Sequence, residues 1–513
     1  MNAFEPYFYG EHGAARSYLF AKLFPLLLAL DTWMLMIGHA GRYGVAGFNV
    51  AHFAWLDALL PMPVAGFYVG VLVLTGLLSL VVALTGVRRS TGLVLFALYT
   101  LSWSMSMLDS YQHHYLLSVL LLCFAFFPEL TAAQLHAQPP AAPDEGRGKP
   151  KRAIEHELER AQRDELWGWV YTGVVLAAGL GYALIDHGTH TWVAFFAFAC
   201  VVAVATAFYT PQRPAPPLAA GFGFNLLGVT VCVVYLYTAL AKMDANWIAG
   251  HTLLRISAVE REFAGLAALG EALGIERERF WGLFATLVIP QELFVGAAYL
   301  LAVRSDRAPR AWVSALTGAA FALAIALHVG AEAMGLEIGW FSAYMLLLAC
   351  CYLLPLRAVD RLVTALTWPA RWVARQAGEL GDAAQVPLAG SLGLALGGGA
   401  LLLMVGKLID LPGAVPACGI AAAALLVVTL VCARRGRDPR GHIAASAVAG
   451  MAMWLAIASS PVRWDFYRYL GGDLMRRDEP EAALEAYLRG ERYAPPGKSR
   501  ADKIEQLRER LGR

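Results

Sequence analysis

The sequence predicts an all-α membrane protein, a polytopic bundle of transmembrane helices followed by a short helical tail. Of its 513 residues, 58 % are hydrophobic and only 16 % are charged, whereas about a quarter of the residues are charged in an average soluble protein. The charged residues are separated by apolar stretches of roughly 20 residues, the length of helix that crosses a bilayer core. These stretches are continuously apolar and do not alternate, which disfavours a closed β-barrel.

Thirteen stretches have the length and apolarity of a membrane-spanning helix. They cover residues 18–38, 64–86, 90–108, 115–133, 167–186, 191–209, 217–241, 281–302, 311–331, 337–356, 389–409, 413–433 and 442–460. The N-terminal segment lacks the short basic-then-apolar pattern of a signal peptide. We therefore expect the first span to target the chain to the membrane.

Arginine and lysine are concentrated in every second predicted loop, and this sets the predicted orientation. The loops that follow the even-numbered spans carry 20 basic residues, and the complementary loops carry six. Cytoplasmic loops of membrane proteins are enriched in these residues. The pattern therefore predicts an N-terminus in the cytoplasm and a C-terminal tail outside.

Three segments are predicted to lie outside the hydrocarbon. Residues 135–165 form a cytoplasmic linker that begins rich in proline and glycine, and residues 243–280 form an outer loop with a short helix. The tail, 461–513, resembles one tetratricopeptide unit, whose small and aromatic residues let two helices interlock. The residues with this spacing are Tyr467, Leu470, Gly471, Leu474, Ala483, Tyr487, Gly490 and Pro495. Such a hairpin can pack on its own membrane domain or dock a partner, and both interpretations stay open.

Several kinds of site and partner are not indicated. The seven cysteines are never spaced as CxxC, so the sequence predicts neither a zinc site nor a disulfide framework. The basic residues form no block of the kind that binds nucleic acid. Walker-type and HExxH motifs are also missing from the sequence. The lipid bilayer is the one partner that composition alone predicts.

Ionisable residues in or beside the spans are the candidate functional residues, because a charge in hydrocarbon is costly. The predicted topology brings the two histidines 113 and 114, Lys242 and His328 to one depth at the outer face, although they lie far apart in the sequence. The full set is Lys22, Asp31, His113, His114, Lys242, Glu292, His328, Lys407 and Asp410.

Each candidate also has a purely structural explanation. Lys242 can extend to the interface as terminal lysines of spans do, and a histidine at a helix end can be an interfacial hydrogen-bonding residue. Glu292 can pair with Lys22 or compensate for backbone left unpaired by Pro290. The aromatic residues near the span ends fit an interfacial belt; they are Tyr235, Trp247, Trp340 and Tyr344.

Three segments resemble the HTTM domain, the membrane module of the vitamin K-dependent gamma-carboxylase family. The first, which contains Lys242, reads YLYTALAKMDANWIAG and is similar to the family's tyrosine-rich span that ends in lysine and continues with Asp-x-x-Trp. The second, which contains His113 and His114, reads SYQHHYLLSVLLLCFAFFP and resembles a His-x-Tyr-Leu span. The third, which begins with His328, reads HVGAEAMGLEIGWFSAYMLL and resembles a later His…Ile-Gly-x-Phe span.

The resemblance implies a domain over residues 1–356 and a function. The implied cofactor is reduced vitamin K or another isoprenoid hydroquinone, with O2 and CO2 as co-substrates. A glutamate-containing protein or peptide would approach from the extracytoplasmic side. The resemblance assigns to Lys242 the role of the base that deprotonates the hydroquinone. It matches His113, with His114 beside it, to the histidine that steadies the oxygenated intermediate.

The same resemblance makes His328 a pocket-lining residue, and we add Tyr235, Trp247 and Glu292 as further cofactor-binding candidates. A lysine is normally protonated at neutral pH, but desolvation at the edge of the hydrocarbon favours the neutral amine. A neutral amine can accept the hydroquinone's proton. The cofactor would then supply the difficult chemistry, and the protein would supply position and dryness.

The chain also departs from the animal carboxylases, which carry a large lumenal region after the membrane module. Here an amphipathic stretch (361–378) and three extra spans occupy residues 357–460, and the tail follows. Two other functions therefore stay open. One is a non-carboxylating quinone-binding or protein-maturation factor that uses the same pocket. The other is a transporter, whose relay would use Asp31, Glu292 and Lys22.

Overall fold

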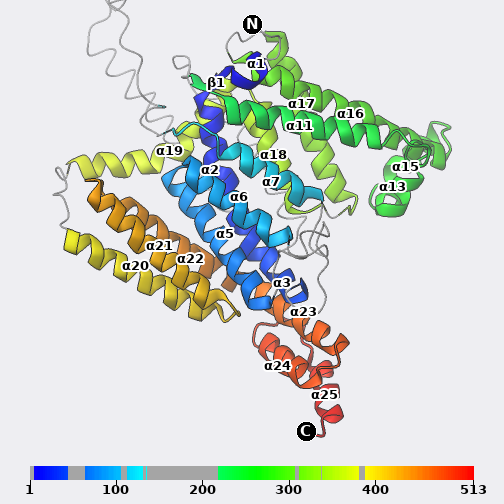
Figure 1. Ribbon diagram of the computed structural model, residues 1–513. Helices are drawn as coiled ribbons and strands as arrows, with labels where there is room; N and C mark the ends of the chain where they lie inside the picture. The colour runs from blue at the N-terminus through cyan, green and yellow to red at the C-terminus, as the bar shows by residue number, and fades with distance from the viewer. Residues whose placement is uncertain are drawn as a thin grey trace, which may run out of the picture. The chain divides into compact units, whose positions relative to one another are not determined.

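The computed structural model describes residues 5–43, 64–104, 112–130, 135, 218–306, 311–336, 338–379 and 388–513. The chain divides into two compact units (Figure 1). Unit 1 comprises Met1–Phe20 and Phe126–Leu380, and unit 2 comprises Ala21–Ala125 and Gly381–Arg513.

The described part of unit 1 is mostly helical and contains one pair of short strands. Strand β1 (Glu11–Gly13) pairs antiparallel with β2 (Leu218–Ala220), with His12 opposite Ala219. The helices of this unit are α1 (Glu5–Tyr9), α11 (Phe222–Ala241), α12 (Ala245–Ile248), α13 (His251–Ile256), α14 (Val259–Glu262), α15 (Ala264–Ala272), α16 (Arg277–Ser305), α17 (Ala311–Ala333), α18 (Trp340–Tyr352) and α19 (Leu356–Glu379).

Unit 2 begins within α2 (Ala14–Asp31), which continues through a π-helical turn (Thr32–Met36) into α3 (Ile37–Tyr43). The other helices of this unit before the tail are α5 (Ala65–Thr85), α6 (Arg89–Ser104), α7 (Gln112–Phe124), α20 (Leu388–Ile409), α21 (Ala414–Arg434) and α22 (Arg440–Ser459). The tail consists of α23 (Val462–Arg476), α24 (Pro480–Glu491) and α25 (Ala501–Arg510).

The all-α, multi-pass prediction is confirmed, but the count of thirteen spans is not. Eight of the described helices are long and apolar enough to cross a membrane, and a ninth is added if α18 and the start of α19 form one bent span. The stretches predicted over 90–108 and 115–133 contain helices over Arg89–Ser104 and Gln112–Phe124, and residues 105–111 between them lie outside the described residues. The predicted spans 167–186 and 191–209 lie outside the described residues, as does the predicted linker beyond Leu135.

The span predicted over 337–356 is interrupted by a sharp bend. Helix α18 ends at Tyr352, Pro355 follows, and the axis of the next helical segment is turned by 113°. Proline favours the first turn of a new helix because it has no N–H to donate. The 13 residues of α18 reach only about 20 Å, less than a hydrocarbon core of ~30 Å. Residues 342–354 are all buried, so α18 is enclosed by protein and need not reach both sides of a bilayer.

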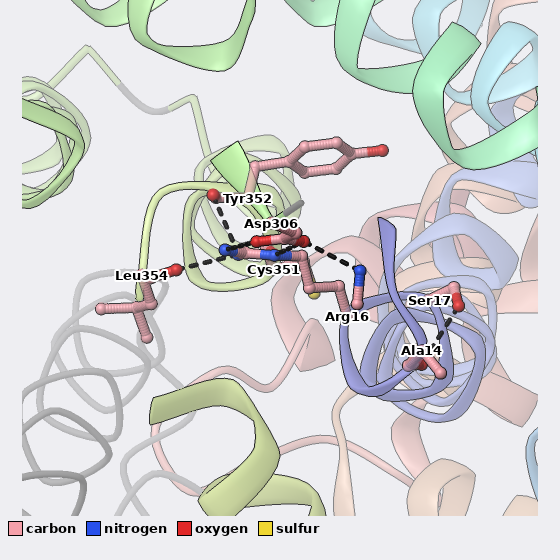
Figure 2. Close-up of polar contacts among 8 residues, drawn as sticks. Ala14, Arg16, Ser17, Asp306, Cys351, Tyr352 and Leu354 are labelled. Carbon is pink, nitrogen blue, oxygen red and sulfur yellow. Dashed lines mark hydrogen bonds and ion pairs between the residues drawn. The ribbon is translucent and has the colours of Figure 1, made fainter. Parts of the chain in front are cut away.

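Arg16 fixes the end of unit 1 at which this bend lies (Figure 2). Its guanidinium forms a two-pronged pair with Asp306, with Nε–Oδ2 at 2.8 Å and Nη2–Oδ1 at 2.9 Å. The remaining nitrogen, Nη1, donates to the carbonyl oxygens of Cys351, Tyr352 and Leu354 at 2.7, 3.0 and 2.8 Å. These are helix-end carbonyls, which have no partner inside their own helix. One buried side chain therefore joins the ends of α16 and α18 to the N-terminal segment.

The charge of Arg16 also sets the protonation of its partner. Burial alone would raise the pKa of Asp306, but the charge and hydrogen bonds of Arg16, with the N–H of Gly13, hold that pKa below its usual value. The carboxylate therefore stays ionised, and the contribution of the pair to stability is lost only when the pH falls through this lowered pKa.

An aromatic column runs through the interior of unit 1 from β1 to α11. The ring of His12 stacks on Phe224 at 4.3 Å between centroids, and Phe224 stacks on Tyr352 at 4.2 Å. Tyr352 contacts Tyr299 at 5.5 Å, and Tyr299 stacks on Tyr235 at 5.9 Å. Burial lowers the pKa of His12 to about 3, so its ring is neutral at physiological pH. The column connects the end fixed by Arg16 to the middle of α11.

The tail packs on membrane helices of its own unit. A Cβ added to Gly41 in α3 would collide with the carbonyl oxygen of Phe466 in α23. The hydroxyl of Tyr467 donates to the Asp410 carbonyl at 2.6 Å, and that of Tyr493 donates to the Asp410 carboxylate at 2.7 Å. The ends of α3 and α20 and the start of α23 therefore lie at one end of unit 2. The predicted topology also puts them on one side of the membrane.

The helices of the tail interlock through the small residues that the tetratricopeptide-like spacing marked. A Cβ on Gly471 would lie 3.0 Å from the ring of Tyr487, and one on Gly490 would lie 3.0 Å from the Cβ of Tyr467. Glycine at these positions lets α23 and α24 approach closely. The contacts of α23 with α3 and with the end of α20 agree with the first interpretation of the tail, a hairpin that packs on its own membrane domain.

We expect Arg16→Lys to lower the free energy of unfolding by about 2–4 kcal/mol. Lysine keeps the positive charge but lacks the planar fork, so helix-end carbonyls lose their donor. The measurement is the midpoint of thermal unfolding in detergent. Arg508→Lys, at an exposed position of the tail, is the control, and an unchanged midpoint for Arg16→Lys would show that the fork is dispensable.

Gly41→Val is expected to detach the tail, because the new side chain would occupy the space of the Phe466 backbone. Limited proteolysis of the full chain in detergent should then cleave the tail at least several-fold faster. Gly441→Val is the matched control, since nothing lies within 4 Å of a Cβ at that helical position of the same unit. Equal protection of the tail in both variants would contradict the packing described for α23.

Candidate functional site

Lys242 stands at the C-terminal end of α11, where the chain turns into the short helices α12 to α15. The Asp244 side chain caps the next helix by accepting from the backbone N–H groups of Asn246 and Trp247 at 2.8 and 3.1 Å. Such a cap satisfies N–H groups that a helix start leaves unpaired. The indole of Trp247 donates to the carbonyl of Ala285 in α16 at 2.9 Å. The Lys-Met-Asp-x-x-Trp pattern is therefore a turn that fixes Trp247 beside Lys242.

The ammonium of Lys242 pairs with Glu292 of α16. The Nζ atom lies 2.9 and 3.0 Å from the two carboxylate oxygens and 5.3 Å from the centre of the Trp247 ring. The side chains of lysine and glutamate are 21 % and 7 % exposed. Lys22, the partner considered from the sequence, instead donates to the carbonyls of Ala83 and Leu84 in unit 2 at 2.7 and 3.2 Å. Glu292 is therefore paired with Lys242, a residue of the same unit.

Tyr235 and His328 form a second contact on the same face of α11. The tyrosine hydroxyl lies 3.0 Å from Nε2 of His328 in α17, and both side chains are buried. Tyr235 precedes Lys242 by seven residues, which is two helical turns or about 10 Å along the axis. Gly296 in α16 allows the close approach, since a Cβ there would lie 3.0 Å from the Cβ of Tyr235. Five of the predicted site residues therefore lie on or against α11: Lys242, Glu292, Trp247, Tyr235 and His328.

Sequence reasoning missed Glu332, which lies one turn beyond His328 on α17. Its Oε1 accepts from the N–H of Gly339 at 2.6 Å and from the hydroxyl of Ser342 at 3.1 Å, at the start of α18. A carboxylate at a helix N-terminus is stabilised by unpaired N–H groups and by the helix dipole. The signal was present in the sequence as an acidic residue four positions after a histidine in an apolar stretch.

His113 and His114 belong to unit 2. The Nδ1 atom of His114 lies 2.8 Å from the hydroxyl of Tyr99, and its ring lies parallel to that of Trp103 at 6.4 Å. His114 is buried, whereas His113 is partly exposed and its ring lies 4.6 Å from that of His114. His114 is thus the more enclosed of the two, although the motif matched His113 first. The predicted site residues fall into two groups, one in each unit.

Two other ionisable residues of the spans, Asp31 and Asp410, lie where they contribute to the fold. Asp31 is buried directly before the π-helical turn, Thr32–Met36. Asp410 holds the tail through Tyr467 and Tyr493, as described above. Within the ranges that the structure describes, no three His, Cys, Asp or Glu side chains are grouped so that they could hold a metal ion.

Comparison of the chain with models of protein families, with curated proteins and with solved structures finds no match. The likeness of the three motifs to the gamma-carboxylase family therefore stays a prediction. What the site can do is argued below from its residues.

Removing Lys242 alone would leave the Glu292 carboxylate without its cation at a nearly buried position. We expect Lys242→Met to destabilise the chain by about 1–3 kcal/mol and the double variant Lys242→Met, Glu292→Leu to be more stable than this single variant. Thermal unfolding of both single variants and the double variant in detergent completes the cycle. Strictly additive effects would show that the two side chains are not coupled.

Proposed function

We propose that unit 1 binds a lipid-soluble hydroquinone and that Lys242 and Glu292 together take its proton, in a quinol- and oxygen-dependent reaction of the gamma-carboxylase type. The observation that carries this proposal is the Lys242–Glu292 pair, an amine and a carboxylate held together on two membrane helices and largely removed from water. The resemblance of the surrounding motif to that family supports the same function.

The residues around the pair fit an aromatic diol. The ammonium of Lys242 can stabilise a negatively charged oxygen, and the carboxylate of Glu292 can accept a hydroxyl proton. The Trp247 ring, fixed by Ala285, offers an apolar face beside them. When bound, a reduced quinone would supply the reaction with oxygen and the strong base that removes a glutamate γ-proton.

The proton balance requires both members of the pair. Lys242 and Glu292 form an ion pair, and from the charged form of this pair Lys242 can act as a base only after its own proton has moved to the carboxylate. The net change is that Glu292 gains a proton, while Lys242 keeps its positive charge next to the ligand oxygen that lost one. In a low-dielectric site this exchange keeps one anion beside the ammonium at each stage. Tyr235 and His328, which are hydrogen-bonded to each other, lie two turns before Lys242 along the axis of α11.

A second candidate function is a quinone-binding or protein-maturation factor without carboxylation. The observation that favours it is the same ion pair, because an ammonium already neutralised by a carboxylate can bind a polar head group without moving a proton. The two candidates differ in turnover and share the binding site.

The test uses the full chain in nanodiscs with reduced menaquinone or vitamin K, oxygen, bicarbonate and a glutamate peptide. We expect quinone epoxide from the wild type, and a rate at least about 100-fold lower from both Lys242→Met and Glu292→Gln, since a general base contributes a factor of this size or more. Lys407→Met is the matched control, because Lys407 is an exposed lysine at the end of α20 in unit 2.

Each result separates the candidates. Equal epoxide rates from the wild type and the two site variants would contradict the proposed role of the pair. If the wild type forms no epoxide but quinone bound to the purified protein is lost in Lys242→Met, the binding function is correct and the enzymatic one is wrong.

A further inference from the structure

Helix α19 takes no part in the site described above, and its composition differs from that of the membrane-spanning helices. Its 24 residues separate apolar from polar side chains far more sharply than those of α11, α16 or α17, and they are less apolar as a whole. A helix with this combination lies in the plane of a membrane interface. The membrane-spanning helices of unit 1 need apolar residues on all sides, whereas α19 has one side that is rich in arginine.

The sequence of α19 places its arginines on one side. A helix advances by about 100° per residue, so Arg357, Arg361, Arg371 and Arg375 fall within an arc of about 80°. An arc of similar width on the opposite side holds Val359, Val363, Leu366, Ala370 and Val373, whereas Trp368 and Trp372 fall on or beside the arginine arc. With Asp360 and Glu379 as the only acidic residues between Leu356 and Glu379, the helix has a net charge of +2.

The apolar side of α19 begins against protein and then leaves it. Val359 and Val363 are 0 % and 1 % exposed, whereas Leu366, one turn later on the same side, is 51 % exposed. The start of the helix is fixed to unit 1, because Leu356 occupies the space that a Cβ on Gly13 would need. Thr364 and Thr367 are 3 % and 5 % exposed, so protein covers another side of the helix through Thr367, while the side that carries Leu366 is left uncovered.

The position of the bend indicates what covers the rest. Helix α19 starts beside Leu354, whose carbonyl is bound by Arg16, and Arg16 also binds Asp306 at the end of α16. The chain carries three more arginines around that aspartate, at 304, 307 and 310. This end of unit 1 is thus the one that the positive-inside rule assigns to the cytoplasmic leaflet, which is rich in anionic lipid. The axis of α19 begins at this end and is turned by 113° from the axis of α18.

We propose that α19 is an interfacial helix whose arginines bind the phosphates of anionic phospholipid, with acyl chains covering Leu366. The guanidinium fork matches a phosphate in shape and charge. The four arginines on one face and the net positive charge favour an anionic lipid over a zwitterionic one. The proposal does not depend on the chemistry of Lys242 and Glu292.

The first test measures lipid preference by native mass spectrometry of the full chain in detergent, titrated with dioctanoyl phosphatidylglycerol or dioctanoyl phosphatidylcholine. We expect phosphatidylglycerol to bind at least about 5-fold more tightly, the factor that one arginine contributes near an anionic surface. Replacing the four arginines of α19 with glutamine should reduce this preference to about one. Replacing four exposed tail arginines with glutamine, at 476, 492, 508 and 513, should leave it unchanged; an unchanged preference in the α19 variant would overturn the proposal.

A second test needs no charge removal and reports where the lipid lies. Benzoylphenylalanine at position 366, in chain reconstituted into phosphatidylglycerol nanodiscs, should form a phospholipid adduct on illumination. The same group at Leu488, an exposed apolar residue of the tail, is the control and should form none. No lipid adduct at 366, or a crosslink to protein only, would overturn the proposal even if the arginine variant failed to fold.

Discussion

A buried helix end must have its carbonyl groups satisfied, and in unit 1 the guanidinium of Arg16 does this for α18. By pairing with Asp306 at the same time, it fixes the end of α16 to the end of α18 and to the strand that carries His12. The aromatic column starts from this fixed end and reaches Tyr235 on α11. The geometry of Tyr235, Lys242 and Glu292 thus depends on a contact at the far end of the aromatic column.

The sequence predicted most membrane helices because apolar length is a direct consequence of bilayer thickness. The prediction of a full span was wrong for α18, whose surroundings are protein and not lipid. Helix α18 is as apolar as a span, yet 13 residues suffice since it is enclosed by other helices. Its apolarity alone cannot distinguish these surroundings, and only Pro355 marked the bend. The tail was predicted better, because close packing at Gly471 and Gly490 is a steric requirement visible in residue spacing.

For the site, the high cost of charge in hydrocarbon drew attention to Lys242 and Glu292, which the structure pairs at 2.9 Å. The pairing of Lys242 with Glu292 could not be derived, since it depends on which two helices become neighbours. From the sequence, Lys22 was also a possible partner of Glu292. The sequence did not predict Glu332 or Tyr99 as site residues, because their roles depend on the groups that they contact in the fold. Arg16 was also not predicted, because an arginine near the start of a first span resembles an ordinary membrane-flanking charge.

The contact between α3 and α23 has a consequence for how the protein is made. Gly41 and Phe466 are separated by most of the chain, so a ribosome finishes nearly every membrane helix before this contact can form. The side of α3 that carries Gly41 therefore stays without α23 until residues 462–476 have been made. Contacts of such long range form late in folding, so a chain that stops before α23 would lack this contact.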